Sequence, residues 1–110
     1  MLFISVDDFF KKTAALRPIT REQERAYAVQ MKNGDADARQ AIITGYLPYV
    51  AASVRHLEPG MQTFTVVMAC CAALEKAVDS FNFLQDSERF SHRLSWWMRQ
   101  TITRCIAQRP

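Results

Sequence analysis

Residues 90–106 read FSHRLSWWMRQTITRCI, and their spacing predicts a helix with two different faces. At about 100° per residue, one face collects mostly apolar side chains that suit a core. This face holds Leu94, Met98, Thr101, Ile102, Cys105 and Ile106. The opposite face holds Arg93, Trp96, Trp97, Gln100, Thr103 and Arg104. The helix is therefore predicted to carry its two tryptophans beside cations and hydrogen-bonding side chains.

The adjacent tryptophans have two interpretations at this point. Trp96 and Trp97 could flank the aliphatic stripe and complete a core. Alternatively, flat rings beside guanidinium and amide groups could stack on bases while the cations hold phosphates. The cationic and hydrogen-bonding side chains on the same face as the rings favour this second interpretation.

The positive charge of the chain is concentrated at the same end. The net charge is only +3, and residues 1–85 balance nine Lys/Arg against nine Asp/Glu. From residue 86 onward, five arginines oppose only Asp86 and Glu88, and arginine suits both phosphate binding and ring stacking. A solvated helix face would explain this charge alone, but the neighbouring aromatic residues favour a nucleic-acid surface.

Length and composition predict one cytoplasmic domain that spans residues 1–110. With 49% hydrophobic residues, 110 residues suffice for one core and are too few for two ordinary domains. The three cysteines include the adjacent pair Cys70 and Cys71, and their spacing fits neither a disulfide framework nor a metal site. No apolar run approaches a membrane span and no secretory signal is recognised, so no membrane association is expected.

Catalysis is not expected from this sequence. His56 and His92 stand apart from any Cys, Asp or Glu at metal-ligand spacing. The sequence also lacks a nucleophile elbow, a phosphate-binding loop and a paired-carboxylate pattern. We therefore expect a protein that is not an enzyme and needs no metal or other cofactor.

An all-α bundle of about five helices is the predicted fold, because no segment alternates cleanly with period two. The expected helices cover residues 6–13, 20–33, 35–57, 63–80 and 91–108. Thr20 and Gln23 in TREQ form a capping box, and Pro48 predicts a kink near Gly45 or a break. The fourth helix begins FTVVMACCAAL, apolar on nearly every face, which predicts burial on most sides or a partner.

Several segments together resemble the housekeeping type of bacterial RNA polymerase sigma factor. RFSHRLSWWMRQTITRCIA, residues 89–107, resembles that family's promoter-reading helix, whose pattern is F-S-T-Y-A-x-W-W-I-R-Q-A-I-x-R-x-I. Residues 18–57 resemble its L-T-x-E-E-E helix and the following G-D-x-x-A-R segment, and ALEKAVDSFN resembles G-L-x-R-A-V-E-K-F-D. The resemblance covers residues 5–108 and corresponds to regions one-point-two and two of such a factor.

This resemblance implies transcription initiation, with the melted minus-ten strand of promoter DNA as one partner. It implies that Trp96 and Trp97 pack on bases at the upstream edge of the melted DNA. Gln100 and Thr103 would then face the upstream base pair. Arg99 and Arg104 would bind phosphates, and Phe90 would belong to an aromatic platform for the unpaired strand. The resemblance thus implies a DNA-binding set of nine residues: Phe90, His92, Arg93, Trp96, Trp97, Arg99, Gln100, Thr103 and Arg104.

The second implied partner is the largest subunit of RNA polymerase. The family docks on it with D-L-I-Q-E-G-N-I-G-L, which aligns with TVVMACCAAL at residues 65–74, where the acidic and amide groups are absent. The implied partner-binding positions are Thr65, Met68, Ala69, Cys71 and Ala72. Two further departures are Arg93 in place of the aromatic that stacks with a flipped adenine, and one extra residue between Phe81 and Phe90.

Two functions therefore stay open. The first is a sigma-factor-like initiation module that binds promoter DNA and RNA polymerase. The alternative is a degenerate sigma-like domain that lacks normal polymerase docking and acts as a protein-interaction or regulatory module, with a homodimer or a regulatory partner. The tryptophan face favours the first, whereas Arg93 and the apolar segment at residues 65–74 favour the second.

Overall fold

Side-chain caps define where most of the helices begin. In a computed structural model that describes residues 2–85 and 87–109, Ser5, Asp35 and Thr63 each accept a backbone N–H from the first turn of the following helix. The predicted capping box is confirmed: Thr20 Oγ1 accepts from Gln23 N at 3.1 Å, and Gln23 Oε1 accepts from Thr20 N at 3.0 Å. These bonds satisfy N–H groups that the helix itself leaves unpaired.

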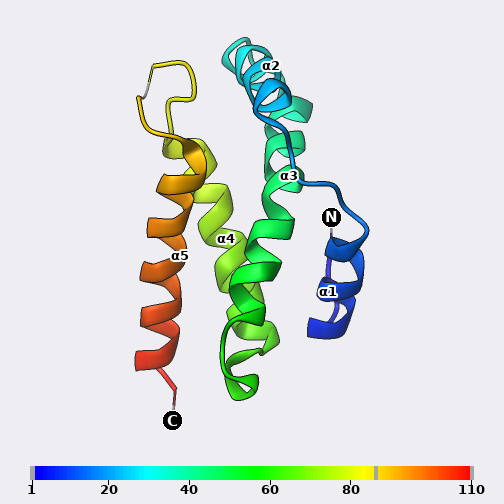
Figure 1. Ribbon diagram of the computed structural model, residues 1–110, viewed down its shortest axis with the longest axis vertical. Helices are drawn as coiled ribbons and strands as arrows, with labels where there is room; N and C mark the ends of the chain where they lie inside the picture. The colour runs from blue at the N-terminus through cyan, green and yellow to red at the C-terminus, as the bar shows by residue number, and fades with distance from the viewer. Residues whose placement is uncertain (1, 86, 110) are drawn as a thin grey trace.

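The all-α prediction is confirmed within the described residues, which contain five α-helices, one short 3-10 turn and no strand. The elements are α1 (Val6–Ala14), α2 (Arg21–Lys32), α3 (Ala36–Arg55), η1 (Pro59–Met61), α4 (Phe64–Ser80) and α5 (Phe90–Ala107). In Figure 1, α5, α4 and α3 lie side by side, α1 lies beside the lower part of α3, and α2 lies across its upper part. The molecule is elongated, with extents of 44 × 26 × 20 Å.

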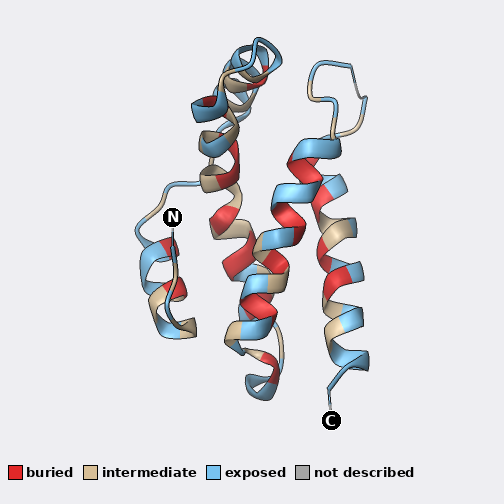
Figure 2. Ribbon diagram, turned by 180° about the vertical axis from the view of Figure 1, so that it is seen from behind, coloured by how far each residue is buried: buried red, intermediate tan, exposed pale blue. Residues whose placement is uncertain are grey.

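Helix α4 lies in the middle of this arrangement, and its apolar sequence is explained by the two neighbours. It packs on α3 from one side and on α5 from the other, as the buried residues of Figure 2 indicate. Seven of its side chains are buried: Val66, Val67, Cys70, Ala73, Leu74, Ala77 and Val78. Seven others are exposed, so α4 is buried along one side only and the predicted burial on most sides is not reached.

Helix α3 runs without interruption through Pro48, so the predicted alternative of a break is wrong. Packing against α1, α2 and α4 holds the helix along its length, which offsets the hydrogen bond that proline cannot donate. The linker between α1 and α2 crosses α3 at Gly45, where Ile19 N donates to the Gly45 carbonyl at 3.1 Å. Gly45 is therefore a contact point for the linker.

Candidate nucleic-acid interface

Helix α5 separates into the two predicted faces, with corrections at Ile106 and Trp97. Leu94, Met98 and Thr101 are buried against the core, and the Thr101 hydroxyl has no hydrogen-bond partner among the described residues. Ile102 and Cys105 are half-buried. Ile106, predicted on the core face, is 50% exposed. It lies in the last turn of α5, too near the end of the helix for the neighbouring elements to cover it.

The opposite face of α5 is open to solvent along most of the helix. It exposes His92, Arg93, Trp96, Arg99, Gln100, Thr103 and Arg104. Within the part of the chain that the structure describes, neither Arg99 nor Arg104 forms an ion pair with a protein carboxylate. Both guanidinium groups are therefore available to bind an anion. We call this set of seven residues the α5 face.

The two tryptophans have different surroundings, so each interpretation of the pair describes one ring. Trp96 is 45% exposed, whereas Trp97 is partly buried and packs against the core. Their ring centroids are 5.6 Å apart and their planes are nearly perpendicular, at 88°. A base that stacks on the Trp96 ring is therefore nearly perpendicular to the Trp97 ring and cannot stack on both.

Phe90 does not form part of an exposed platform in this structure. Its ring is 1% exposed and belongs to an aromatic cluster in the core that also contains Tyr46, Phe81 and Phe83. The centroid distances from Phe90 to these rings are 4.8 Å, 5.3 Å and 4.9 Å, respectively. The cluster joins α3, the segment at residues 81–83 and the start of α5, so it supports the buried side of α5 opposite the α5 face.

Tyr46 connects this cluster to α2, which sequence reasoning did not predict. Its hydroxyl donates a short hydrogen bond to the Glu24 carboxylate. Burial, followed by this bond to Glu24, raises the pKa of Tyr46, so the phenol stays protonated at neutral pH. No local signal reveals the contact, because residues 24, 46 and 90 come together only through the packing of three helices.

Glu88 is a second unpredicted residue, and its carboxylate contacts both Arg93 and His92 of the α5 face. Its Oε1 lies 2.8 Å from Arg93 Nε and 2.6 Å from Arg93 Nη2. Its Oε2 lies 3.1 Å from His92 Nδ1. Burial alone would raise the pKa of Glu88, but hydrogen bonds from Arg93 and His92 lower it below the usual value. Glu88 is thus ionised at neutral pH and offsets charge at the start of α5.

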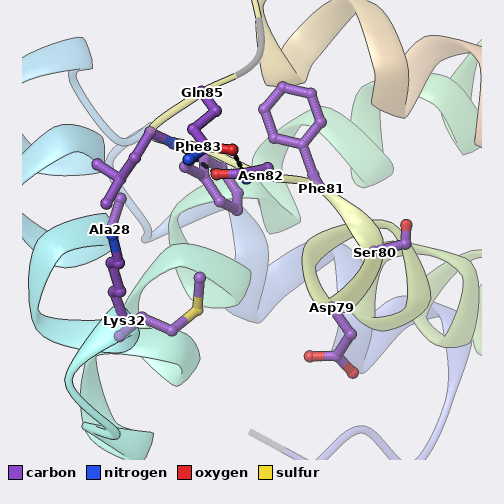
Figure 3. A pocket seen from close by; sticks show the side chains of 10 residues that line it. Ala28, Lys32, Asp79, Ser80, Phe81, Asn82, Phe83 and Gln85 are labelled. Carbon is purple, nitrogen blue, oxygen red and sulfur yellow. Dashed lines mark hydrogen bonds between the residues drawn. The ribbon is translucent and has the colours of Figure 1, made fainter.

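A cavity of about 380 Å³ lies beside the aromatic cluster, between α2 and the loop that follows α4. Ala28, Met31 and Lys32 line it from α2, and residues 79–85 line it from the other side (Figure 3). Asn82 Nδ2 donates to Gln85 Oε1 at 2.9 Å, which folds the loop around the cavity. Aromatic, amide and lysine side chains therefore meet in one concave region that sequence reasoning did not identify.

The predicted partner-binding residues lie together on α4, away from the α5 face. Thr65, Met68 and Ala72 are exposed, with Met68 at 46%, while Ala69 and Cys71 are half-buried. We call these five residues the α4 strip. Burial, then the nearby charge of Glu75, raises the pKa of Cys71 to about 11, so its thiol is uncharged at neutral pH and the strip is uncharged along its length.

Residues 2–85 and 87–109 contain no group of three or more His, Cys, Asp or Glu side chains placed to hold a metal ion. Within the same ranges, none of the helices has the length and apolar character needed to cross a membrane.

Comparison with known proteins finds relatives that match most of this chain. RNA polymerase sigma factor SigA of Clostridium acetobutylicum is 32% identical over an aligned length of 109 residues, and the alignment covers 94% of this chain and 29% of that protein. SigA of Listeria monocytogenes and of Listeria innocua are each 30% identical over 100 residues, or 90% of this chain and 26% of theirs. The chain is sigma-factor-like. No protein-family model matches it.

The sigma-factor-like domain thus spans less than a third of the length of the curated relatives that it matches. The matched share of the chain is 90% or more, so the similarity extends over most of the domain. It therefore supports the general character of the domain, while the partners of the α5 face and of the α4 strip are matters for a proposal.

Proposed function

We propose that this sigma-factor-like domain binds the melted minus-ten strand of promoter DNA through the α5 face during transcription initiation by RNA polymerase. The observation that carries the proposal is the separation of α5 into a buried aliphatic face and an exposed face that combines an aromatic ring with arginines. An aromatic ring gives a base a stacking surface, and cations track the phosphates of the same strand. The SigA relatives are named as RNA polymerase sigma factors, which supports this partner class.

The positions on α5 indicate a division of roles. Trp96 offers the more exposed ring for stacking, while Arg99 and Arg104, without protein carboxylate partners among the described residues, suit phosphates. Gln100 and Thr103 lie between these arginines and carry groups that both donate and accept hydrogen bonds, as base edges require. The α5 face therefore combines phosphate contacts, which position the strand, with base contacts, which read its sequence.

Replacing Trp96 with alanine tests the role of the exposed ring. We expect binding of a single-stranded minus-ten-like oligonucleotide to weaken by about 1–3 kcal/mol, with helix content unchanged. Fluorescence anisotropy of a labelled strand measures the affinity, and circular dichroism monitors folding. Ile106→Ala is the matched control, because it removes a similarly exposed apolar side chain from the same helix outside the α5 face. Equal affinity losses in the two variants would contradict the proposal.

We further propose that the α4 strip docks on the largest subunit of RNA polymerase. Three of its five residues are exposed, and it lies on a different helix from the α5 face, so both partners could bind together. A second candidate uses the same strip for self-association or a regulatory partner. The observation that favours this second candidate is Met68, a large apolar side chain that is 46% exposed where the family's docking segment is polar.

The double substitution Met68→Gln and Ala69→Glu separates these two candidates. If the strip docks on polymerase, restoring the amide and the acid should strengthen binding to the polymerase subunit in a pull-down titration. If the strip forms a homodimer, a charge in that apolar interface should dissociate it, as light scattering at micromolar concentration would detect. A wild-type monomer that binds polymerase would exclude the second candidate, and a stable dimer indifferent to polymerase would exclude the first.

A further inference from the structure

Glu88 fixes one edge of the Arg93 guanidinium and leaves another edge open. The Glu88 Oε1 atom accepts a hydrogen bond from Nε and forms an ion pair with Nη2, and these two nitrogens lie along one side of the guanidinium plane. A guanidinium has five N–H bonds, so the edge formed by Nη1 and the outer hydrogen of Nη2 stays available. The Arg93 side chain is 49% exposed, and this edge can therefore reach a ligand.

The charge around Arg93 disfavours a phosphate as that ligand. Glu88 offsets the charge of Arg93 and also lies against His92, so a phosphate would meet a carboxylate within the same cluster. Arg99 and Arg104 have no such acid beside them in the described structure, and they remain the stronger phosphate sites. The open edge of Arg93 is better matched to an uncharged group with two neighbouring acceptors.

Guanine presents such a pair in its O6 and N7 atoms, which arginine binds through two parallel hydrogen bonds. Adenine places a donor at N6 beside N7, and a guanidinium can accept nothing from it. Arg93 also lies three residues before Trp96, one turn away on the same side of α5, so neighbouring bases of one strand could reach both side chains. We propose that Glu88 positions Arg93 to select guanine in an unpaired strand bound by the α5 face.

This inference rests on the proposed binding of single-stranded DNA. The test places one guanine at successive positions of a labelled oligothymidine strand and measures affinity by anisotropy. At the best position we expect guanine to bind roughly five- to a hundredfold more tightly than adenine. The analogue 7-deazaguanine, which lacks the N7 acceptor, should lose most of this preference. A preference for cytosine over guanine, or equal binding of all bases, would overturn the inference.

Two variants test the two members of the pair. Arg93→Lys keeps the charge but cannot form the planar pair of bonds, so the preference for guanine over adenine should disappear. Glu88→Gln removes the opposing charge and frees the guanidinium to contact phosphates. Its guanine preference should fall, and its log-affinity against log-salt slope should steepen by up to about 0.7. Glu22→Gln, an exposed acid-to-amide change on α2, is the matched control and should alter neither quantity.

The outcomes separate this inference from the proposed function. If the wild-type domain binds no single-stranded DNA at any salt concentration, both are wrong. If it binds single strands through Trp96 but shows a guanine preference that survives Arg93→Lys, only the inference about Arg93 is wrong. If Glu88→Gln keeps the full preference and the same salt slope, Arg93 acts without Glu88 and the positioning role is excluded.

Discussion

Replacing Phe90 with alanine is expected to lower the free energy of unfolding by about 3–5 kcal/mol. The ring is 1% exposed and lies among Tyr46, Phe81 and Phe83, so its removal leaves a cavity that these large rings cannot readily fill. The same change should also loosen the start of α5, because the cluster joins this helix to α3. Urea unfolding followed by circular dichroism measures the loss.

Trp96→Ala is the control for this experiment, since it removes an aromatic ring from the same helix at a position that is 45% exposed. We expect Trp96→Ala to cost much less stability and to act on DNA binding instead. Phe90→Leu, which keeps much of the volume, should recover a large part of the stability lost in Phe90→Ala. A Phe90→Ala protein of normal stability with weakened DNA binding would restore the exposed-platform role that the family resemblance implies.

Gly45→Ala is expected to lower the free energy of unfolding by about 1–3 kcal/mol. This loss would occur even though alanine is more favourable than glycine inside a helix by about 1 kcal/mol. A Cβ atom at this position would lie 2.5 Å from Ile19 Cβ, which is too close for two carbon atoms. The Ile19 Cβ is attached directly to the backbone, so the linker itself would have to move. That movement would strain the bond from Ile19 N to the Gly45 carbonyl.

Gly60→Ala is the matched control, because a Cβ at Gly60 meets no atom within 4 Å and the backbone there does not have a positive φ. This variant should be close to neutral in thermal unfolding. Adding Ile19→Gly to Gly45→Ala removes the clashing atom, so the double variant should lose less stability than the two single changes would sum to. Additive losses would show that the predicted clash is not the cause.

Much of the helical architecture follows from local signals in the sequence. The capping box at Thr20 and the periodic apolar residues of α5 depend only on neighbouring residues, and both predictions agree with the structure. The uninterrupted α3 shows the limit of such signals. Pro48 has a local cost that predicts a break, but contacts with three other helices, which no local pattern encodes, keep the helix intact.

The candidate site could be predicted in part for the same reason. Helical spacing placed Arg93, Trp96, Gln100 and Arg104 on one exposed side of α5, since this requires only a helix and a core. Spacing could not assign different surroundings to Trp96 and Trp97, nor place Phe90 inside a cluster whose other rings come from distant segments. Glu88 was missed because an acid in a basic region gives no sign of which cation it binds.

Because α4 lies between α3 and α5, a change in the volume of a buried α4 side chain can alter its packing against both helices. Val67 and Leu74, for example, are fully buried in a helix that contacts α3 on one side and α5 on the other. Interiors at crystal-like density have no spare space to absorb such a change. Substitutions at the buried positions of α4 should therefore be accepted mainly in combination with compensating changes on both flanking helices, whereas exposed positions of α2 need no such compensation. The helix that gives the domain its shape is thus the one least able to vary alone.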